Sequence, residues 1–287
     1  PKTGKLTGDA VHLNEEDASK LLASLKDKTA SVKSVESRPF TQKPPPPFVT
    51  STLQQEGSRK LSFSARRTMQ VAQNLYENGF ITYMRTDSTT LSNEAIDGAR
   101  NLIGAEFGSE FLPPAPREYK TKVRNAQEAH EAIRPAGASF AHPAEVKEKL
   151  GFEAFRLYEL IWKRTLACQM KDAEGTRVTV SISLGNGNFR ASGKTISFPG
   201  FLRAYVEGSD DPEAELGDME KILPPLKEGE GVLVDSLVPV SHTTQSPARF
   251  TEGSLIKELE KLGIGRPSTW ATIVDVVLSR EDRKSVV

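Results

Sequence analysis

The sequence has a single cysteine, no long apolar run and no net charge. One cysteine among 287 residues, Cys168, excludes an internal disulfide and a cysteine-cluster zinc site within the chain, and it suits a reducing compartment. No apolar run approaches the roughly 18 residues of a membrane-spanning helix, and no signal peptide opens the chain. Basic and acidic residues balance at 38 each, which excludes nucleic-acid binding through bulk charge and leaves only a local patch.

The order of the remaining patterns predicts an α+β protein with more than one domain. The length suffices for two or three domains, and a composition with 37% hydrophobic residues is ordinary for a globular chain. Because strands flank a long helical stretch, we expect a β-rich domain of residues 1–43 and 170–240, interrupted by a helical block at 44–169. A third, helical part should follow at 241–281. Period-two patterns predict strands at 10–13, 30–35, 178–182, 188–191, 195–198 and 232–237.

Helix boundaries are predicted by polar residues that precede an apolar stripe. In the helix expected over 51–61, we place Gln54 and Gln55 on the exposed side. In the helix expected over 64–78, Tyr76 belongs to the apolar stripe and is predicted to lie in the core. The expected N-caps are Asn14, Ser64, Ser92 and Ser268.

The stretch around Tyr83 holds the strongest candidate for chemistry. Phe80 to Met84 predicts a short strand, on which Tyr83 and Arg85 would share one face because residues two apart point the same way. By spacing alone, a half-buried sheet tyrosine with a solvated arginine is the commoner arrangement. The functional alternative is a tyrosine nucleophile for phosphorus. A phenol with a pKa of about 10 needs a cation beside it, and a guanidinium grips phosphate through two donors.

A second polar cluster follows at His130 to Arg134. One helical turn would put both side chains on one face, and Pro135 would end that turn. Each can donate hydrogen bonds to a phosphate, and a histidine also moves protons near neutral pH. Glu131 is a candidate partner that orients one of them.

Near the end, two short helices are predicted on either side of the turn 263–267. Helix, glycine turn, helix is a helix-turn-helix pattern, which by itself is weak support for DNA binding because such hairpins are common in cores. Arg266, Ser268 and Thr269 stand at the start of the second helix, where backbone N–H groups favour a phosphate.

Ten consecutive residues, Gly79 to Ser88, resemble the active-site signature of type IA DNA topoisomerases, and in particular of the bacterial topoisomerase I group. Further blocks resemble the same family in the same order along the chain. These blocks are Pro47–Gln55, Glu128–Pro135, Ala167–Met170 and Leu262–Thr269.

The resemblance implies a role for individual residues. Tyr83 would be the nucleophile, Arg85 would stabilise the charged transition state, and His130 would contact the scissile region. The fold implied is an arch of strands that carries a helical domain with the tyrosine, followed by a partial helical DNA-binding domain. The DNA contacts implied are Arg85, Asp87, His130, Arg134, Arg266, Ser268 and Thr269.

The family's activity would be breakage, strand passage and rejoining of single-stranded DNA through a 5′-phosphotyrosyl link, which relaxes negatively supercoiled DNA without ATP. In the family, an acidic (Toprim) domain with a glutamate and an Asp-x-Asp-x-Glu motif binds Mg²⁺. No Asp-x-Asp-x-Glu occurs in this sequence, so we expect no metal ligands here and no relaxation by this chain alone. The family's zinc ribbons are also missing. The resemblance further implies a monomer in the bacterial cytoplasm, associated with the nucleoid and not with a membrane.

Two other classes of function stay open at this stage. One is a DNA-binding module without enzymatic activity that uses the helix-turn-helix, and the other is a structural piece without activity. The chain starts at Pro1, and its last residues, 282–287, depart abruptly from the family pattern. We therefore expect an internal fragment whose final six residues are not native.

Overall fold

The computed structural model describes residues 13–119, 131–208, 222–243, 246 and 248–280. The chain forms two compact units. One consists of Pro1–Phe40, Gly175–Ser197 and Met219–Ala248, and the other consists of Thr41–Glu174, Phe198–Asp218 and Arg249–Val287. Each unit is described separately below.

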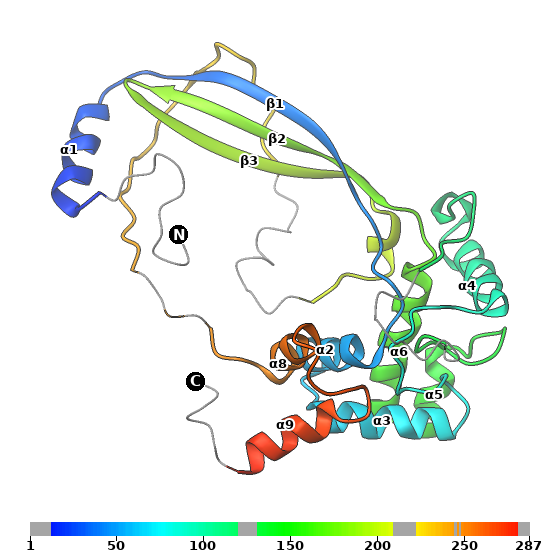
Figure 1. Cartoon of the computed structure of the whole chain (residues 1–287). Helices are drawn as coiled ribbons and strands as arrows, with labels where there is room; N and C mark the ends of the chain where they lie inside the picture. The colour runs from blue at the N-terminus through cyan, green and yellow to red at the C-terminus, as the bar shows by residue number, and fades with distance from the viewer. Residues whose placement is uncertain (1–12, 120–130, 209–221, 244–245, 247, 281–287) are drawn as a thin grey trace. The chain divides into compact units, whose positions relative to one another are not determined.

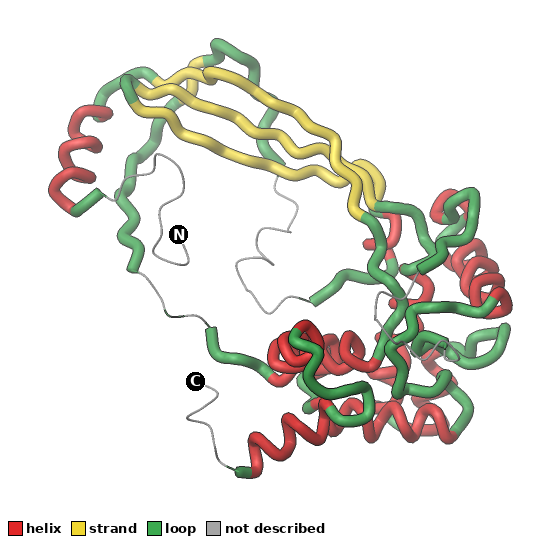
Figure 2. The backbone as a smooth tube through the Cα atoms, viewed as in Figure 1, coloured by secondary structure: helices red, strands yellow, loops and turns green. Residues whose placement is uncertain are grey.

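The first unit is built on an antiparallel sheet with the strand order β3-β2-β1-β4 (Figures 1 and 2). Pairing of early with late strands was expected from the sequence and is confirmed. The two strands predicted at 188–191 and 195–198 are one strand, because pairing with β2 continues through the intervening glycine. Of the strand predicted at 232–237, only Val232 is paired, opposite Ala30. The strands are β1 Ala30–Gln42, β2 Ala173–Leu184, β3 Gly187–Phe198 and β4 Gly231–Val232.

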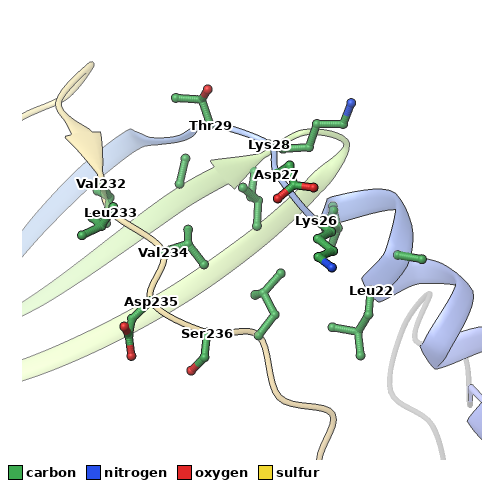
Figure 3. Close-up of a pocket in the computed structure, with 15 residues that line it drawn as sticks. Leu22, Lys26, Asp27, Lys28, Thr29, Val232, Leu233, Val234, Asp235 and Ser236 are labelled. Atoms are coloured by element: carbon green, nitrogen blue, oxygen red, sulfur yellow. The ribbon is translucent and has the colours of Figure 1, made fainter.

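Helix α1 (Glu15–Leu25) begins where the sequence predicts, with the Asn14 side chain accepting from the backbone N–H of Asp17 at 2.8 Å. Its last turn, the β2–β3 hairpin end and the segment after β4 line an open groove of about 640 Å³ (Figure 3). The floor is a small apolar cluster of Leu25, Ala30 and Leu184.

The second unit is helical, and its core surrounds the buried helix α6. The predicted N-caps Ser64 and Ser92 are confirmed, since each accepts a backbone N–H of the first turn. None of the helices in the described parts is both long and apolar enough to cross a membrane. The helical elements are α2 Thr50–Leu61, α3 Ala65–Glu77, α4 Asn93–Glu106, η1 Ser109–Phe111, α5 Pro143–Leu150, α6 Phe152–Ala167, η2 Gly200–Arg203, α8 Glu252–Lys261 and α9 Trp270–Ser279.

Helices α8 and α9 pack against α2 and α3 within this unit. Ala65 of α3 shares an apolar cluster with Ile256 of α8 and with Trp270 and Val274 of α9. These helices therefore belong to the same compact unit as the helical block, whereas the sequence pattern predicts a separate part at 241–281. Residues 198–218 are likewise grouped with the helices and not with the strands.

Helix α2 is the main departure from the predicted burial pattern. Gln54 and Gln55, expected on the exposed side, are 0% and 6% exposed. The cause is α8, which covers that side: the Ser51 hydroxyl donates to Glu260 Oε1 at 2.7 Å, and Gly253 lies against the backbone of Gln55. A polar helix face looks solvated in a sequence, but here a second polar helix covers it.

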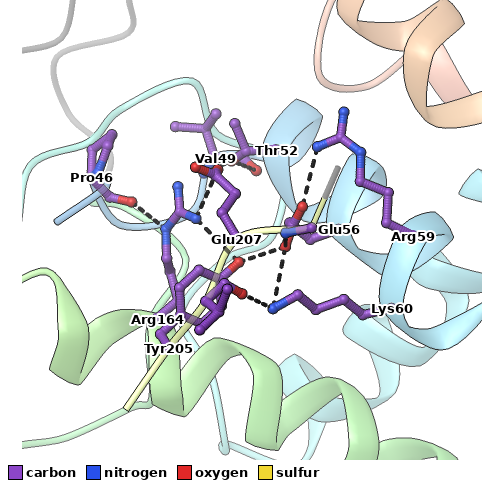
Figure 4. Close-up of polar contacts among 11 residues, drawn as sticks. Pro46, Val49, Thr52, Glu56, Arg59, Lys60, Arg164, Tyr205 and Glu207 are labelled. Carbon is purple, nitrogen blue, oxygen red and sulfur yellow. Dashed lines mark hydrogen bonds and ion pairs between the residues drawn. The ribbon is translucent and has the colours of Figure 1, made fainter. Parts of the chain in front are cut away.

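The far end of α2 joins a buried charged cluster (Figure 4). Glu56 accepts from the Tyr205 hydroxyl at 2.7 Å, and Arg164 donates to Tyr205 Oη at 3.2 Å and to Glu207 at 3.1 Å. Burial is the largest influence on Lys60 and lowers the pKa of its ammonium, against the attraction of Glu56. Paired charges in such a site hold the segment around Tyr205 against α2 and α6.

Candidate active site

The loop that carries Tyr83 begins with a glycine turn at the end of α3. Gly79 has φ +74°, and the N–H groups of Gly79 and Phe80 donate to the carbonyls of Tyr76 and Leu75, at 2.9 Å each. Glycine adopts this left-handed conformation without strain, so the chain can reverse sharply here. The turn at Gly79 therefore ends α3 and starts the loop.

The strand predicted over Phe80 to Met84 is wrong. Only Ile81 pairs, in an isolated antiparallel bridge with Pro135. Two backbone hydrogen bonds flank this bridge, from Thr82 N to Arg134 O and from Ala136 N to Phe80 O, and beyond them the Met84 carbonyl accepts from the Thr50 hydroxyl instead. The predicted alternation nevertheless holds: Tyr83 and Arg85 are exposed, while Met84 between them is buried. The two side chains therefore leave the same side of an extended segment.

The threonine that opens α2 holds the backbone on both sides of Arg85. The Thr50 hydroxyl is buried, donates to Met84 O at 2.7 Å or Thr86 O at 3.0 Å, and accepts from Thr86 N at 2.9 Å. The backbone N–H of Thr50 also donates to Thr86 O, at 2.9 Å. One residue thus satisfies the peptide groups before and after Arg85.

The residue before Tyr83 is held from the other side. Thr82 N donates to Arg134 O at 3.0 Å, the Thr82 hydroxyl donates to Ala132 O at 2.7 Å, and it accepts from Arg134 N at 3.0 Å. Tyr83, the candidate nucleophile, therefore lies between Thr82 and Thr86, and the hydrogen-bond partners of both threonines lie far away in the sequence. Such long-range bonds fix a loop more firmly than a local turn does.

Arg134 is buried inside this support and does not face solvent. Its guanidinium donates to Glu131 Oε2 at 2.6 and 3.1 Å, to the carbonyls of Pro135 and Gly137 at 2.8 and 3.0 Å, and to Ser92 Oγ at 3.3 Å. These bonds occupy all five N–H donors of an arginine. The resemblance implies that Arg134 contacts a phosphate. Its guanidinium is instead bonded within the protein, where it holds the loop.

Glu131 completes that support. Partial burial alone would raise its pKa, but hydrogen bonds from Ser92 and the charge of Arg134 lower the pKa of this carboxyl below its usual value. The helical turn predicted for 130–134 is wrong, because Ile133 is extended and bridges Phe48. His130 lies outside the described residues, so its predicted role stays a prediction.

Arg85 contrasts with Arg134. Its side chain is exposed, and within the described part of the chain no hydrogen bond or ion pair engages its guanidinium. Asp87, the other polar candidate of this loop, is partly buried. The predicted pair of an exposed tyrosine and an exposed arginine thus lies together on one supported loop.

The other group of predicted DNA contacts lies between α8 and α9. Arg266, Ser268 and Thr269 are all exposed. Ser268 is not the N-cap of α9, which follows Thr269 without a side-chain cap. Instead the Thr269 hydroxyl accepts from Arg266 N at 2.8 Å, and the Arg266 guanidinium donates to Gly265 O at 2.7 Å. Among the described residues, the hydrogen bonds that shape this turn are local.

The described residues of this region offer few groups for metal binding or thiol chemistry. Within the described ranges, His, Cys, Asp and Glu side chains nowhere gather in threes, so these residues do not fit a metal site. Cys168 is buried, and burial raises the pKa of its thiol to about 12, which keeps the thiol protonated.

The comparisons with known proteins identify the family of this chain. The model of a DNA topoisomerase family matches residues 5–282. The chain therefore belongs to the DNA topoisomerase family, in its type IA branch.

Individual relatives are bacterial. DNA topoisomerase 1 of Streptomyces coelicolor is 55% identical over 96% of this chain, and that of Synechococcus elongatus is 54% identical over 93%. The chain spans only 29% and 30% of the length of these relatives. The solved structure of full-length topoisomerase I from Thermotoga maritima is 35% identical, covers 96% of this chain and 44% of its own, and superposes with a TM-score of 0.76.

The support of the loop by Thr50 and Thr82 is not predicted from the sequence, because the partners of these residues lie 34 and 50 positions away. A weak signal was present, since a buried threonine hydroxyl must find a partner. Tyr76, predicted to lie in the core, is 41% exposed instead.

Proposed function

We propose that this chain is the tyrosine-bearing part of a type IA enzyme that breaks and rejoins one DNA strand. The observation that carries the proposal is the Tyr83 loop: an exposed tyrosine and an exposed arginine two residues apart, on a backbone held by Thr50 and Thr82. The names of the relatives, DNA topoisomerase 1, support it.

In the proposed reaction, Tyr83 Oη attacks the phosphorus of a phosphodiester. The new bond is a 5′-phosphotyrosyl ester, the broken bond is P–O3′, and the proton lost by the phenol ends on the released 3′-hydroxyl. Because one phosphoester replaces another, the 3′-hydroxyl can attack back and restore the strand without ATP. Between the two steps, a second DNA segment passes through the gap. This cycle relaxes negatively supercoiled DNA.

Arg85 would stabilise the charge that develops on the phosphoryl oxygens. A guanidinium keeps its charge at neutral pH and offers parallel donors to two oxygens. Arg134 and Glu131 act through the loop and not on the phosphate. Contacts of His130 and Asp87 with the scissile region remain part of the proposal by resemblance alone.

Arg266, Ser268 and Thr269 would bind the DNA backbone next to the reacting segment. Their exposed position in a turn just before α9 supports this role, because phosphate contacts need reachable donors. These contacts would position single-stranded DNA without reading its sequence.

The remaining requirements of the reaction lie outside this chain in our proposal. Mg²⁺, which in the family assists phosphoryl chemistry, would be held by the acidic domain and not by residues described here. By itself the chain would bind single strands weakly and would not relax supercoils. The whole enzyme is proposed to act as a monomer on nucleoid DNA in the bacterial cytoplasm, with no membrane association.

The test uses a 3′-labelled single-stranded oligonucleotide, Mg²⁺, an SDS quench and the acidic domain added as a separate chain. Attack by Tyr83 leaves the label on the protein, so a labelled band should migrate with this chain. Tyr83→Phe should abolish the band, and Phe189→Leu, at an exposed aromatic residue of the sheet unit, serves as the control.

An adduct that persists in Tyr83→Phe would refute the nucleophile assignment. Reversible binding without any adduct would favour the alternative, a DNA-binding module that uses the turn between α8 and α9. Relaxation of plasmid DNA by this chain alone would contradict the expected inactivity of the fragment.

A further inference from the structure

A second exposed aromatic residue lies against Tyr83. The rings of Tyr76 and Tyr83 meet edge to face, with centroids 5.3 Å apart and planes at 69°. The two side chains are 41% and 37% exposed. An edge-to-face pair at this separation is an attractive aromatic contact.

The glycine turn at the end of α3 brings the two rings together. Tyr76 stands in the last turn of α3, and its carbonyl accepts the N–H of Gly79, the residue at which the chain reverses. Tyr83 then returns along the end of the helix. Tyr76 belongs to a helix and Tyr83 to a loop whose backbone is held, so the contact between the two rings acts on the side chain of Tyr83.

Packing does not explain the position of Tyr76. The interior-facing residues of α3 include Val71, Ala72 and Leu75, which fill the core without it. A large aromatic side chain left this exposed contributes little to folding stability, and its described ring contact is with Tyr83.

We propose that Tyr76 is a positioning residue for the Tyr83 ring. It blocks rotation of the phenol about χ1 and χ2, so that Oη stays where an incoming phosphodiester meets it and where Arg85 can reach the same phosphate. Tyr76 touches neither the phosphorus nor the leaving oxygen. This inference rests on the proposed function, in which Tyr83 is the nucleophile.

The contact itself is tested without any reaction, by ¹⁹F NMR of this chain labelled with 3-fluorotyrosine. The chain has five tyrosines, and Tyr83→Phe identifies the Tyr83 signal. Tyr76→Leu removes the neighbouring ring and should move the Tyr83 signal toward its position in an unfolded chain. Tyr76→Phe keeps the ring and should leave the signal in place. Phe189→Leu, at an aromatic residue 40% exposed in the sheet unit, is the matched control and should not move it.

The consequence for the reaction is tested in the labelled-oligonucleotide assay under single-turnover conditions at saturating DNA. Tyr76→Leu should slow adduct formation about fivefold, the size expected for the loss of one aromatic pair, with DNA affinity unchanged. Tyr76→Phe should restore the wild-type rate. A role of the Tyr76 hydroxyl would instead make the phenylalanine variant as slow as the leucine variant.

Two results would overturn the inference. An unmoved Tyr83 signal in Tyr76→Leu would show that the rings do not meet in solution. A weaker DNA affinity with an unchanged rate would show that Tyr76 stacks on a base and does not orient Tyr83. If the wild-type chain forms no adduct at all, the proposed function fails, and the NMR shifts still decide whether Tyr76 holds the Tyr83 ring.

Discussion

The two exposed segments that we propose to contact DNA, the Tyr83 loop and the turn at Arg266, are held in different ways. Bonds from α2 and from the extended segment after Glu131 fix the backbone around Tyr83, across 34 to 52 residues of sequence. The turn at Arg266 is shaped by its own residues, with the Trp270 indole N–H reaching Ile264 O as the widest contact, six residues apart.

This difference matches what each segment is proposed to do. An in-line attack on phosphorus needs a nucleophile and a cation fixed in relation to each other, so the loop that carries them must be preorganised. A backbone contact only needs a reachable positive charge and donors, which a locally shaped turn provides. The tyrosine loop should therefore be sensitive to substitutions far from the chemistry, and the turn should not.

The largest effect is expected from Arg134→Leu. It removes five hydrogen bonds and leaves the Glu131 carboxylate without its ion-pair partner. The free energy of unfolding, measured by urea titration, should fall by about 3 kcal/mol, and adduct formation should be lost with it. Adding Glu131→Leu to this variant should recover part of the stability. If the two substitutions instead lower the free energy of unfolding by the sum of their separate effects, the pair is not coupled.

Thr50→Val keeps the shape of the side chain but removes its hydroxyl. Met84 O and Thr86 N then lose their buried partner, so unfolding should need about 2 kcal/mol less, and the loop around Arg85 should loosen. Adduct formation should slow about tenfold or more, because the guanidinium is displaced. Thr50→Ser retains the hydroxyl and should stay near the wild-type rate. Equal rates in the valine and serine variants would exclude this role.

The Glu131–Arg134 pair predicts a defined pH dependence. The pKa of Glu131 is lower in the folded chain than in the unfolded chain, so its contribution to stability is complete above the unfolded value of about 4.3. That contribution is lost as the pH falls through the lower, folded pKa. Glu131→Gln should therefore weaken the dependence of the unfolding free energy on pH in this acid range. The exposed Glu153, whose pKa Arg67 also lowers, provides the comparison as Glu153→Gln, with a smaller change.

Arg266→Ala should have the smallest effect. The side chain is exposed and its described hydrogen bond is local, so the free energy of unfolding should change by less than about 0.5 kcal/mol. Affinity for single-stranded DNA should weaken equally for all sequences, with the salt-dependence slope reduced by about one. Filter binding at several salt concentrations measures both; an unchanged slope would remove Arg266 from the DNA contacts.

Local features of this fold were predictable from the sequence. The caps at Asn14, Ser64 and Ser92 depend on residues three positions away, and the shared face of Tyr83 and Arg85 depends on a period of two. These signals act over a few residues, so a sequence pattern contains them in full.

Long-range features were not predictable in the same way. The burial of Gln54 depends on α8, about 200 residues later, and the support of the loop by Thr50 depends on a fold that brings two blocks together. The predicted strand at Phe80–Met84 is reduced to one bridge because the Met84 carbonyl bonds to Thr50, 34 residues earlier, which no local pattern reveals.

Hydrogen exchange of single backbone amides in this chain tests the contrast between the two segments most directly. The N–H groups of Thr82 and Thr86, bonded to Arg134 O and Thr50 Oγ1, should exchange far more slowly than those of Arg266 and Thr269, whose partners lie within one exposed turn. Thr50→Val should remove the protection of Thr86 and leave Thr269 unchanged. Similar exchange at all four amides would contradict a preorganised tyrosine loop.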